Sequence, residues 1–322
     1  IGVCHTATAS PGGSGALYLA AANYADRGSK VLLRDRHWGP YDGFLAGCGL
    51  GIATYPLLNE SSALDLDSLR IELDTLSNSQ NKVMSWLNDP AHNPTGLSLS
   101  KEERMSVLQT FTNAAMNHEN VGYTLLIDAA YHLYAEEPHG WAETITDALH
   151  DGMAWPANLL ITFAISLSKS HTVYGLRGGA LVTIHPDQSV VDRITTVMGV
   201  TGRQTWSASS RLAQYSIAKI HSDSKTGSAW SDEKTRLTEI LQQRRTAFIS
   251  ACEKYSVPIN PTHDGFFAWL EHSDAKSIVE TCAADQVYLV PLNGGVRIGL
   301  CAIPTNQIER VAKSLSNALK SE

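Results

Sequence analysis

Short runs of apolar and β-branched residues recur through the first half of the chain, and stretches with helical periodicity follow several of them. Each run has the length and composition of a buried strand. Strands that alternate with helices are typical of a mostly parallel sheet with helices on both faces. The pattern therefore predicts an α/β fold, with strands over residues 30–34, 51–55, 82–86, 123–127, 159–164 and 180–184.

Two helices are indicated most clearly. One spans residues 15–25, after a glycine-rich segment, and the other spans 100–117. The second opens on Ser100 with Glu103 three residues later, the spacing at which a hydroxyl and a carboxylate cap the first turn reciprocally. We therefore expect a capping box there.

A different pattern begins near residue 231, where a charge-rich helical run continues to residue 255. Strand-like segments at 265–272, 286–290 and 295–302 follow, and an amphipathic helix from Asn306 closes the chain. We expect two domains joined by the long helix. The large domain is predicted over residues 1–235 and a small α+β domain over 236–322.

The composition narrows the class of protein. Hydrophobic residues make up 43% of the 322 residues, enough to fill the cores of two domains. Lys and Arg number 25 against 32 Asp and Glu, a net charge of −7, so we expect no nucleic-acid partner. No apolar run reaches the roughly 18 residues of a membrane span, and no signal-peptide pattern opens the chain. We therefore expect a soluble cytoplasmic protein without a membrane partner.

The cysteines and the first residue add two expectations. The five cysteines are far apart and lack the short spacings of zinc ligands, so we expect free thiols, mostly in the core, and no metal site. Residue 1 is Ile rather than Met, and the chain opens directly on a glycine-rich candidate site segment. We expect that no element precedes this segment and that an N-terminal portion is missing from the sequence.

Polar residues after the predicted strands are the candidates for a site, because parallel α/β sheets bind ligands at the carboxyl ends of their strands. The segment SPGGSGAL, residues 10–17, precedes a helix, where glycine amides and the helix N-terminus can bind an anion. A simple turn is the alternative. Trp38 follows the strand at 30–34 and can stack on a flat ring or pack in the core.

The next strands also end in polar groups. Asn93, before Pro94 in the segment AHNPTG, holds an amide in one orientation. Asp128 follows the strand at 123–127, and Tyr131 lies three residues further on. A carboxylate at the end of so apolar a strand needs a partner, because burial of an unpaired charge is unfavourable. That partner is either an arginine of the protein or a protonated ring nitrogen of a ligand.

Lys169 lies in the segment SLSKSHTVYGLRGG, after the strand at 159–164. Ser166, Ser168 and Arg177 flank it and are residue types that bind anions. The amine of Lys169 can form an imine with a carbonyl group. The segment thus combines an amine nucleophile with side chains suited to an anion.

These motifs together resemble a known family. The pattern SxSKxxxxYGxRxG, with HNPTG and DxAY, resembles the fold-type I pyridoxal-phosphate-dependent aminotransferases. SPGGSGAL and RHWGPY are similar to segments of the aspartate and aromatic amino-acid aminotransferase branch. The resemblance covers nearly the whole chain and lacks the family's N-terminal portion. It implies the fold-type I architecture, pyridoxal 5′-phosphate as cofactor, amino-acid and keto-acid substrates, and a homodimer with shared active sites.

The resemblance also assigns roles to residues. Lys169 corresponds to the lysine that binds the cofactor covalently, and Asp128 to the carboxylate that pairs with its ring nitrogen. Asn93 and Tyr131 correspond to residues that hydrogen-bond its phenolic oxygen, and Trp38 to the aromatic residue stacked on its ring. The implied catalytic residues are Lys169, Asp128 and Tyr131. The implied phosphate ligands are Gly13, Ser14, Ser166, Ser168 and Arg177.

Two further arginines correspond to substrate ligands, together with Asn93 and Trp38. Arg297, in GGVRIGL, corresponds to the arginine that binds the substrate's α-carboxylate, and a surface arginine at a strand end is the alternative. Arg203, in TGRQTWSAS, aligns with an arginine that reaches across the dimer to a second carboxylate. A solvated loop arginine is the alternative for Arg203.

Two positions depart from the family. Tyr41 stands where the family often has a histidine that supports the aspartate, and Asn88 stands where another histidine precedes HNPTG. These departures leave the choice between aspartate and an aromatic amino acid open.

The resemblance implies an aminotransferase that moves the amino group of aspartate or an aromatic amino acid to a 2-keto acid such as 2-oxoglutarate. Two alternatives stay open. One is a pyridoxal-phosphate-dependent lyase or synthase on the same scaffold, which would lack keto-acid-dependent conversion of the cofactor to its amine form. The other is an aminotransferase-like ligand-sensor domain of a transcription regulator, which a basic helix-turn-helix ahead of this chain would indicate.

Overall fold

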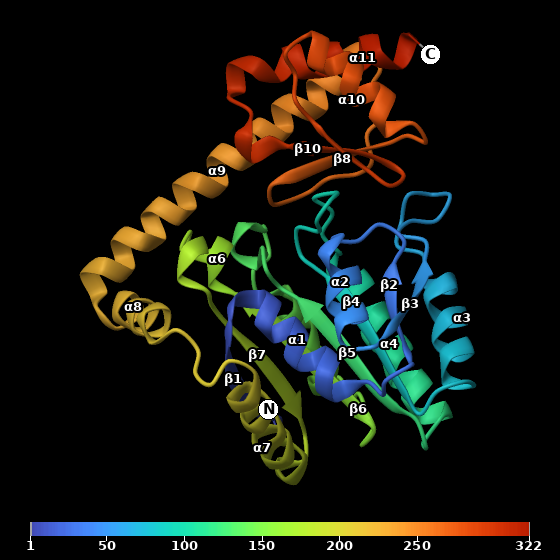
Figure 1. Cartoon of the computed structure of the whole chain (residues 1–322), viewed down its shortest axis with the longest axis vertical. Helices are drawn as coiled ribbons and strands as arrows, with labels where there is room; N and C mark the ends of the chain where they lie inside the picture. The colour runs from blue at the N-terminus through green and yellow to red at the C-terminus, as the bar shows by residue number, and fades with distance from the viewer. Residues whose placement is uncertain (1, 322) are drawn as a thin grey trace. The chain divides into compact units, whose positions relative to one another are not determined.

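The computed structural model describes residues 2–321, which form two compact units (Figure 1). We call the first unit 1; it holds residues up to Asp89, Leu99–His132 and His139–Ser222. Unit 2 holds the chain from Asp223 together with two short segments, Pro90–Ser98 and Leu133–Pro138. The main part of unit 2 thus begins one residue before helix α9 (Ser224–Tyr255). The domain boundary near residue 235 stays a prediction.

Unit 1 is built on a seven-stranded sheet of order β1-β7-β6-β5-β4-β2-β3. Strand β7 runs antiparallel to β1 and β6, and the other described pairs are parallel. The predicted α/β fold with a mostly parallel sheet is therefore confirmed. The six predicted strands are β2 to β7, of which β4 to β7 extend beyond the apolar runs. The strands are β1 (Cys4–Pro11), β2 (Lys30–Arg34), β3 (Gly51–Tyr55), β4 (Lys82–Asn88), β5 (Gly122–Asp128), β6 (Leu159–Ser166) and β7 (Gly178–His185).

Strand β1 contradicts the expectation that no element precedes the glycine-rich segment. It pairs with β7 along its whole length, with Cys4 opposite His185 and Pro11 opposite Gly178. Its sequence, CHTATASP, contains few large apolar residues. An edge strand with one neighbour tolerates such a composition, which is why the hydrophobic pattern did not indicate it.

Helices cover both faces of this sheet (Figure 1). Helices α1, α2 and α7 share one core with the strands, whereas α3 and α4 contact the strands from their other side and α5 packs on α4. The predicted helix at 15–25 is confirmed as α1, and the helix at 100–117 as α4, with the expected capping box between Ser100 and Glu103. The helices are α1 (Gly12–Tyr24), α2 (Pro40–Gly47), α3 (Leu66–Ser77), α4 (Lys101–Asn117), α5 (Gly140–His150), α6 (Leu167–Ser170), α7 (Gln188–Thr205) and α8 (Arg211–Ser222).

Unit 2 packs a small antiparallel sheet of order β8-β10-β9 against three helices. Its core includes Phe248 of α9, Ile278 of α10, Val296 of β10 and Leu315 of α11. The strand predicted at 286–290 is wrong in position, because Gln286 has a φ of 58° and interrupts the extended backbone. The elements after α9 are β8 (Phe267–Glu271), α10 (Ala275–Ala284), β9 (Val290–Leu292), β10 (Gly295–Gly299) and α11 (Ile308–Lys320).

Three simple features concern membranes, metals and thiols. Within residues 2–321, no helix has the length and hydropathy needed to cross a membrane, and no three His, Cys, Asp or Glu side chains are placed to hold a metal ion.

The five cysteines are free thiols. Only Cys252 and Cys282 are buried, so the expectation that most cysteines lie in the core is wrong. Cys4 begins β1, Cys48 directly follows α2 and Cys301 lies in a single 3-10 turn after β10, where burial is incomplete.

Candidate functional site

Six strands of unit 1 end at one edge of the sheet, and five of them lead to predicted site residues. Strands β2, β4, β5 and β6 are parallel in succession, and β1 shares their direction because β7 lies antiparallel between it and β6. The last residues of these strands are Pro11, Arg34, Asn88, Asp128 and Ser166. The residues that follow them gather at this carboxyl edge, where parallel α/β sheets bind ligands.

The first turn of α1 lies against Ser166 and Arg177. A Cβ on Gly12 would lie 2.7 Å from Arg177 Nη2, and one on Gly13 would lie 3.0 Å from Ser166 Cβ, so glycine permits this approach. Arg177 Nη1 donates to Ser168 Oγ at 3.2 Å. The residue before α1 is a proline, which has no side-chain group to cap the helix N–H groups. A guanidinium, two hydroxyls and an uncapped helix N-terminus thus meet, which are the donors that bind phosphate.

Asp128 ends β5 and is only 4% exposed. Its carboxylate accepts hydrogen bonds from the Tyr41 hydroxyl at 2.6 Å and from the Ala130 N–H at 3.1 Å. Asn88 donates its side-chain amide to the Asp128 carbonyl at 2.8 Å. Burial raises the pKa of Asp128, and the two hydrogen bonds and the nearby charge of Lys169 oppose this shift. Both residues that stand in place of the family's histidines therefore hold Asp128.

Lys169 lies on α6, the short helix that follows β6. Its amine lies 5.3 Å from the ring centre of Tyr174, 5.5 Å from that of Tyr131 and 5.9 Å from that of Trp38. Burial lowers the pKa of Lys169; the Asp128 carboxylate opposes this shift and a nearby guanidinium adds to it. A lowered pKa increases the fraction of neutral amine, which is the form that attacks a carbonyl and accepts a proton.

Tyr174 was not among the predicted site residues, although its ring is near the Lys169 amine. Its ring also lies 5.6 Å from the Arg177 guanidinium carbon. The signal was present in the sequence, since Tyr174 is the tyrosine of the pattern SxSKxxxxYGxRxG.

Asn93 and Arg297 belong to unit 2, which brings them together. Arg297 Nη1 donates to Asn93 Oδ1 at 3.1 Å, and the guanidinium carbon lies 4.6 Å from the ring centre of Phe267. Asn93 is buried, whereas Arg297 is partly exposed on β10. The remaining predicted residues except Arg203 lie in unit 1, at the ends of its strands or in the segments that follow them: Gly13, Ser14, Trp38, Asp128, Tyr131, Ser166, Ser168, Lys169 and Arg177.

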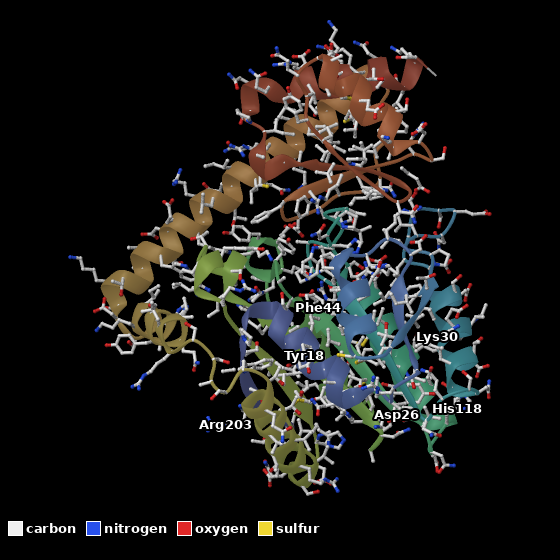
Figure 2. The ribbon with its side chains drawn as sticks, in the orientation of Figure 1. Tyr18, Asp26, Lys30, Phe44, His118 and Arg203 are labelled. Atoms are coloured by element: carbon white, nitrogen blue, oxygen red, sulfur yellow. The ribbon has the colours of Figure 1, made fainter. Side chains whose placement is uncertain are left out.

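Arg203 lies in the last turn of α7 and is exposed (Figure 2). Its Nη1 donates to Ser207 Oγ at 2.9 Å, in the turn that follows the helix. Arg203 therefore lies in a helix and not in a loop. Its side chain is exposed to solvent, as the alternative of a solvated arginine supposed.

The residues at the carboxyl edge of unit 1 fit pyridoxal 5′-phosphate. The closely packed turn of α1 with Arg177 and Ser168 suits a phosphate group. The buried carboxylate of Asp128 suits a protonated ring nitrogen, because a buried carboxylate is stabilised by a positive charge beside it. The Lys169 amine suits an aldehyde carbon. The fold and this donor set are those of a pyridoxal-phosphate-dependent enzyme of fold type I.

Comparison with known proteins identifies the family. The profile described as aminotransferase class I and II matches residues 3–315, and the chain belongs to this family. It is a transaminase, and pyridoxal 5′-phosphate is its cofactor.

Several relatives are similar over most of the chain. A Pseudomonas aeruginosa protein named aromatic-amino-acid aminotransferase is 24% identical over 96% of this chain and 74% of its own length. An Escherichia coli protein named aspartate aminotransferase is 26% identical over 76% of this chain and 58% of its own length. A crystal structure of an aminotransferase from Anaerococcus prevotii has a TM-score of 0.92 and 26% identity, covering 98% of this chain and 75% of that chain.

A further structure shares the fold and holds the cofactor. It is an aromatic-amino-acid aminotransferase from Burkholderia pseudomallei covalently bound to pyridoxal phosphate, with a TM-score of 0.77 and 19% identity. It covers 98% of this chain and 76% of that chain. At this identity the likeness concerns the fold, which is the α/β architecture predicted from the sequence.

Proposed function

We propose that the protein moves the amino group of aspartate or an aromatic amino acid to a 2-keto acid such as 2-oxoglutarate. The observation that carries this proposal is the half-buried Lys169 amine, with its lowered pKa, near the buried Asp128 carboxylate. The names of relatives support amino-acid transamination, since both aspartate and aromatic-amino-acid aminotransferases are similar to this chain. They do not favour the lyase, synthase or sensor alternatives.

Each residue of the carboxyl edge has a proposed task. When bound, the cofactor supplies a conjugated ring that accepts the electron pair of a substrate Cα–H bond. Lys169 would hold the cofactor at its aldehyde carbon, and its neutral amine would accept the proton from the substrate Cα. Asp128 keeps the ring nitrogen protonated, and its bonds from Tyr41 and Ala130 fix its orientation. Trp38 would stack on the ring.

The remaining contacts position the cofactor and the substrate. Asn93 and Tyr131 donate to the cofactor's phenolic oxygen, and Arg297 binds the substrate α-carboxylate bidentately. Arg203 binds a second carboxylate in the partner's site. The phosphate ligands are the first turn of α1, including Gly13 and Ser14, and Ser166, Ser168 and Arg177.

A homodimer in the cytoplasm is the proposed working form. Large apolar side chains on α7 and α8 support an interface there: Val197 and Val200 are 46% and 51% exposed, and Leu212 and Tyr215 are 62% and 65% exposed. Arg203 lies on the same helix α7, which agrees with a role across the interface. A similar Saccharomyces cerevisiae protein is named cytoplasmic aspartate aminotransferase, which supports the location.

The proposal is tested by Lys169→Ala. The variant should lose the cofactor link that borohydride traps and should lose turnover, because the amine that makes the link and moves the proton is gone. Lys101→Ala, an exposed lysine paired with Asp147 on helices α4 and α5, is the control and should keep both. Turnover near the wild-type rate in Lys169→Ala would contradict the assignment.

A further inference from the structure

Two short segments of the chain leave unit 1 and pack in unit 2, and each adjoins a proposed cofactor contact. Segment 90–98 follows β4 and carries Asn93, whereas segment 133–138 begins two residues after Tyr131. One side chain holds both segments. The Asp264 carboxylate accepts a hydrogen bond from Ser98 Oγ at 2.7 Å and another from the Glu136 N–H at 3.0 Å.

The contacts of Asp264 lead directly to the backbone around Asn93. Ser98 Oγ, which donates to Asp264, accepts the Ala91 N–H at 2.9 Å. Gly96 O accepts two N–H groups from the loop that precedes β8, those of His263 and Asp264, both at 2.8 Å. Asn93 therefore lies in a loop whose two sides, at Ala91 and Gly96, are tied to residue 264.

The charge of Asp264 is compensated inside unit 2. The side chain belongs to a residue that is only 8% exposed, and such a carboxylate requires hydrogen bonds and a counter-charge. Arg245 supplies the counter-charge; it is 2% exposed and donates to Gly265 O at 2.7 Å and Phe267 O at 3.0 Å. Burial lowers the pKa of Arg245 to about 10, and the charge of Asp264 opposes that shift. The two buried charges therefore stabilise each other within unit 2.

We propose that Asp264 is a positioning residue for Asn93. It holds segments 90–98 and 133–138 so that the Asn93 amide stays paired with Arg297 and is presented in one orientation to the cofactor's phenolic oxygen. This inference rests on the proposed contact between Asn93 and the cofactor. Its distinctive consequence is that Asp264 acts on the cofactor through Asn93, without touching the cofactor itself.

The test is the pH midpoint at which the bound cofactor's absorption changes from its acid form to its base form. The Asn93 donor favours the deprotonated form, so its loss raises the midpoint. Asn93→Ala should therefore raise it, and Asp264→Ala should raise it by about half a pH unit or more, because the loop no longer holds the amide in place. In the double variant, Asp264→Ala should add no further shift to Asn93→Ala.

Two more variants keep the test interpretable. Asp264→Asn retains the shape and one acceptor, so it should fold and give a smaller shift in the same direction. Asp274→Asn is the matched control, because Asp274 is an exposed carboxylate of the same unit that caps α10 through the Ser277 N–H at 3.0 Å. It should leave the midpoint unchanged.

The outcomes separate the inference from the proposed function. If Asn93→Ala raises the midpoint but neither Asp264 variant does, the positioning role of Asp264 is overturned while the role of Asn93 stands. If Asp264→Ala shifts the midpoint equally with and without Asn93, Asp264 acts by another route and the inference is wrong. If Asn93→Ala itself has no effect, the proposed contact of Asn93 fails, and the inference that depends on it fails too.

Discussion

Tyr41 and Asn88 hold Asp128 by two different bonds. The Tyr41 hydroxyl donates to the carboxylate, and the Asn88 amide donates to the backbone carbonyl of the same residue. Burial and the adjacent charge of Asp128 raise the pKa of Tyr41 well above its usual value. Tyr41 therefore stays a neutral hydrogen-bond donor across physiological pH, whereas an imidazole at this place would titrate there.

Tyr41→Phe should destabilise the cofactor-free protein in a pH-dependent way. Without the hydroxyl, the pKa of Asp128 rises further, and a folded-state pKa above the unfolded value reduces stability as pH rises through it. We expect a loss of about 1.5 to 3 kcal/mol in the free energy of unfolding at pH 8, and a smaller loss at pH 5. Urea unfolding at several pH values measures both.

Tyr24→Phe is the control for this prediction. The Tyr24 hydroxyl is also buried, and it lies 2.7 Å from Thr183 Oγ1, a neutral partner. Its loss should lower stability by about 0.5 to 1.5 kcal/mol, equally at pH 5 and pH 8. Equal, pH-independent losses in both variants would show that Tyr41 does not act on the ionisation of Asp128.

The strands and loops explain why some of the architecture was predictable. Apolar runs located β2 to β7 because each has neighbours on both sides or a covered face, so its sequence must be hydrophobic. Strand β1 was not predicted because its sequence, CHTATASP, contains no run of large apolar residues. The site motifs after β4, β5 and β6 were readable because each follows its strand directly.

Gly96 shows what fixes the loop that carries Asn93. Its φ is +74°, and a Cβ there would lie 2.1 Å from the carbonyl oxygen of Phe267. Gly28 has a similar φ of +88° but nothing within 4 Å of its Cβ position. An alanine at Gly28 would introduce backbone strain alone, whereas an alanine at Gly96 would add a steric clash to the same strain.

Gly28→Ala should cost about 1 to 2 kcal/mol of unfolding free energy, the strain of a left-handed alanine. Gly96→Ala should cost clearly more, because the carbonyl of Phe267 must move as well. It should also raise the pH midpoint of the cofactor's absorption, which Gly28→Ala should leave unchanged. Equal destabilisation by both variants, with no midpoint shift, would mean that the loop adapts without displacing Asn93.

The assignment of loop segments to the two units lay outside what the sequence could show. Asp264 reaches Ser98 and Glu136 across 166 and 128 positions of the chain. Hydrophobic periodicity reports the face that an element buries, but it does not report which distant residue holds a polar loop. The family motif identified Asn93 from the sequence. The hydrogen bonds that connect its loop to Asp264 through Ser98 are visible only in the structure.

The dimer is the level at which Arg203 is expected to act. Arg203→Ala should weaken aspartate and glutamate much more than aromatic donors, because a charge-assisted bond is lost only where a second carboxylate exists. The loss of binding free energy for the dicarboxylic donors should be on the order of 2 to 5 kcal/mol if the pair of Arg203 and the second carboxylate is buried in the complex. Michaelis constants for a panel of donors measure it.

Hybrid dimers test whether Arg203 works in the partner's site. A dimer of one Lys169→Ala chain and one Arg203→Ala chain should have one site with both defects and one site with neither. That intact site should show a wild-type Michaelis constant for dicarboxylates. If Arg203 works within its own chain, both hybrid sites are damaged, and a hybrid that forms without a wild-type site would refute the assignment.

The amino-transfer cycle is tested most directly by its first half alone. The purified protein, loaded with pyridoxal 5′-phosphate, is mixed with a single amino acid from a panel of aspartate, glutamate and the aromatic amino acids, without any keto acid. We predict that a good donor yields one keto acid per active site, that the cofactor's absorption changes to that of its amine form, and that 2-oxoglutarate restores it. Product that keeps accumulating without a keto acid, or no conversion with any donor, would contradict the account.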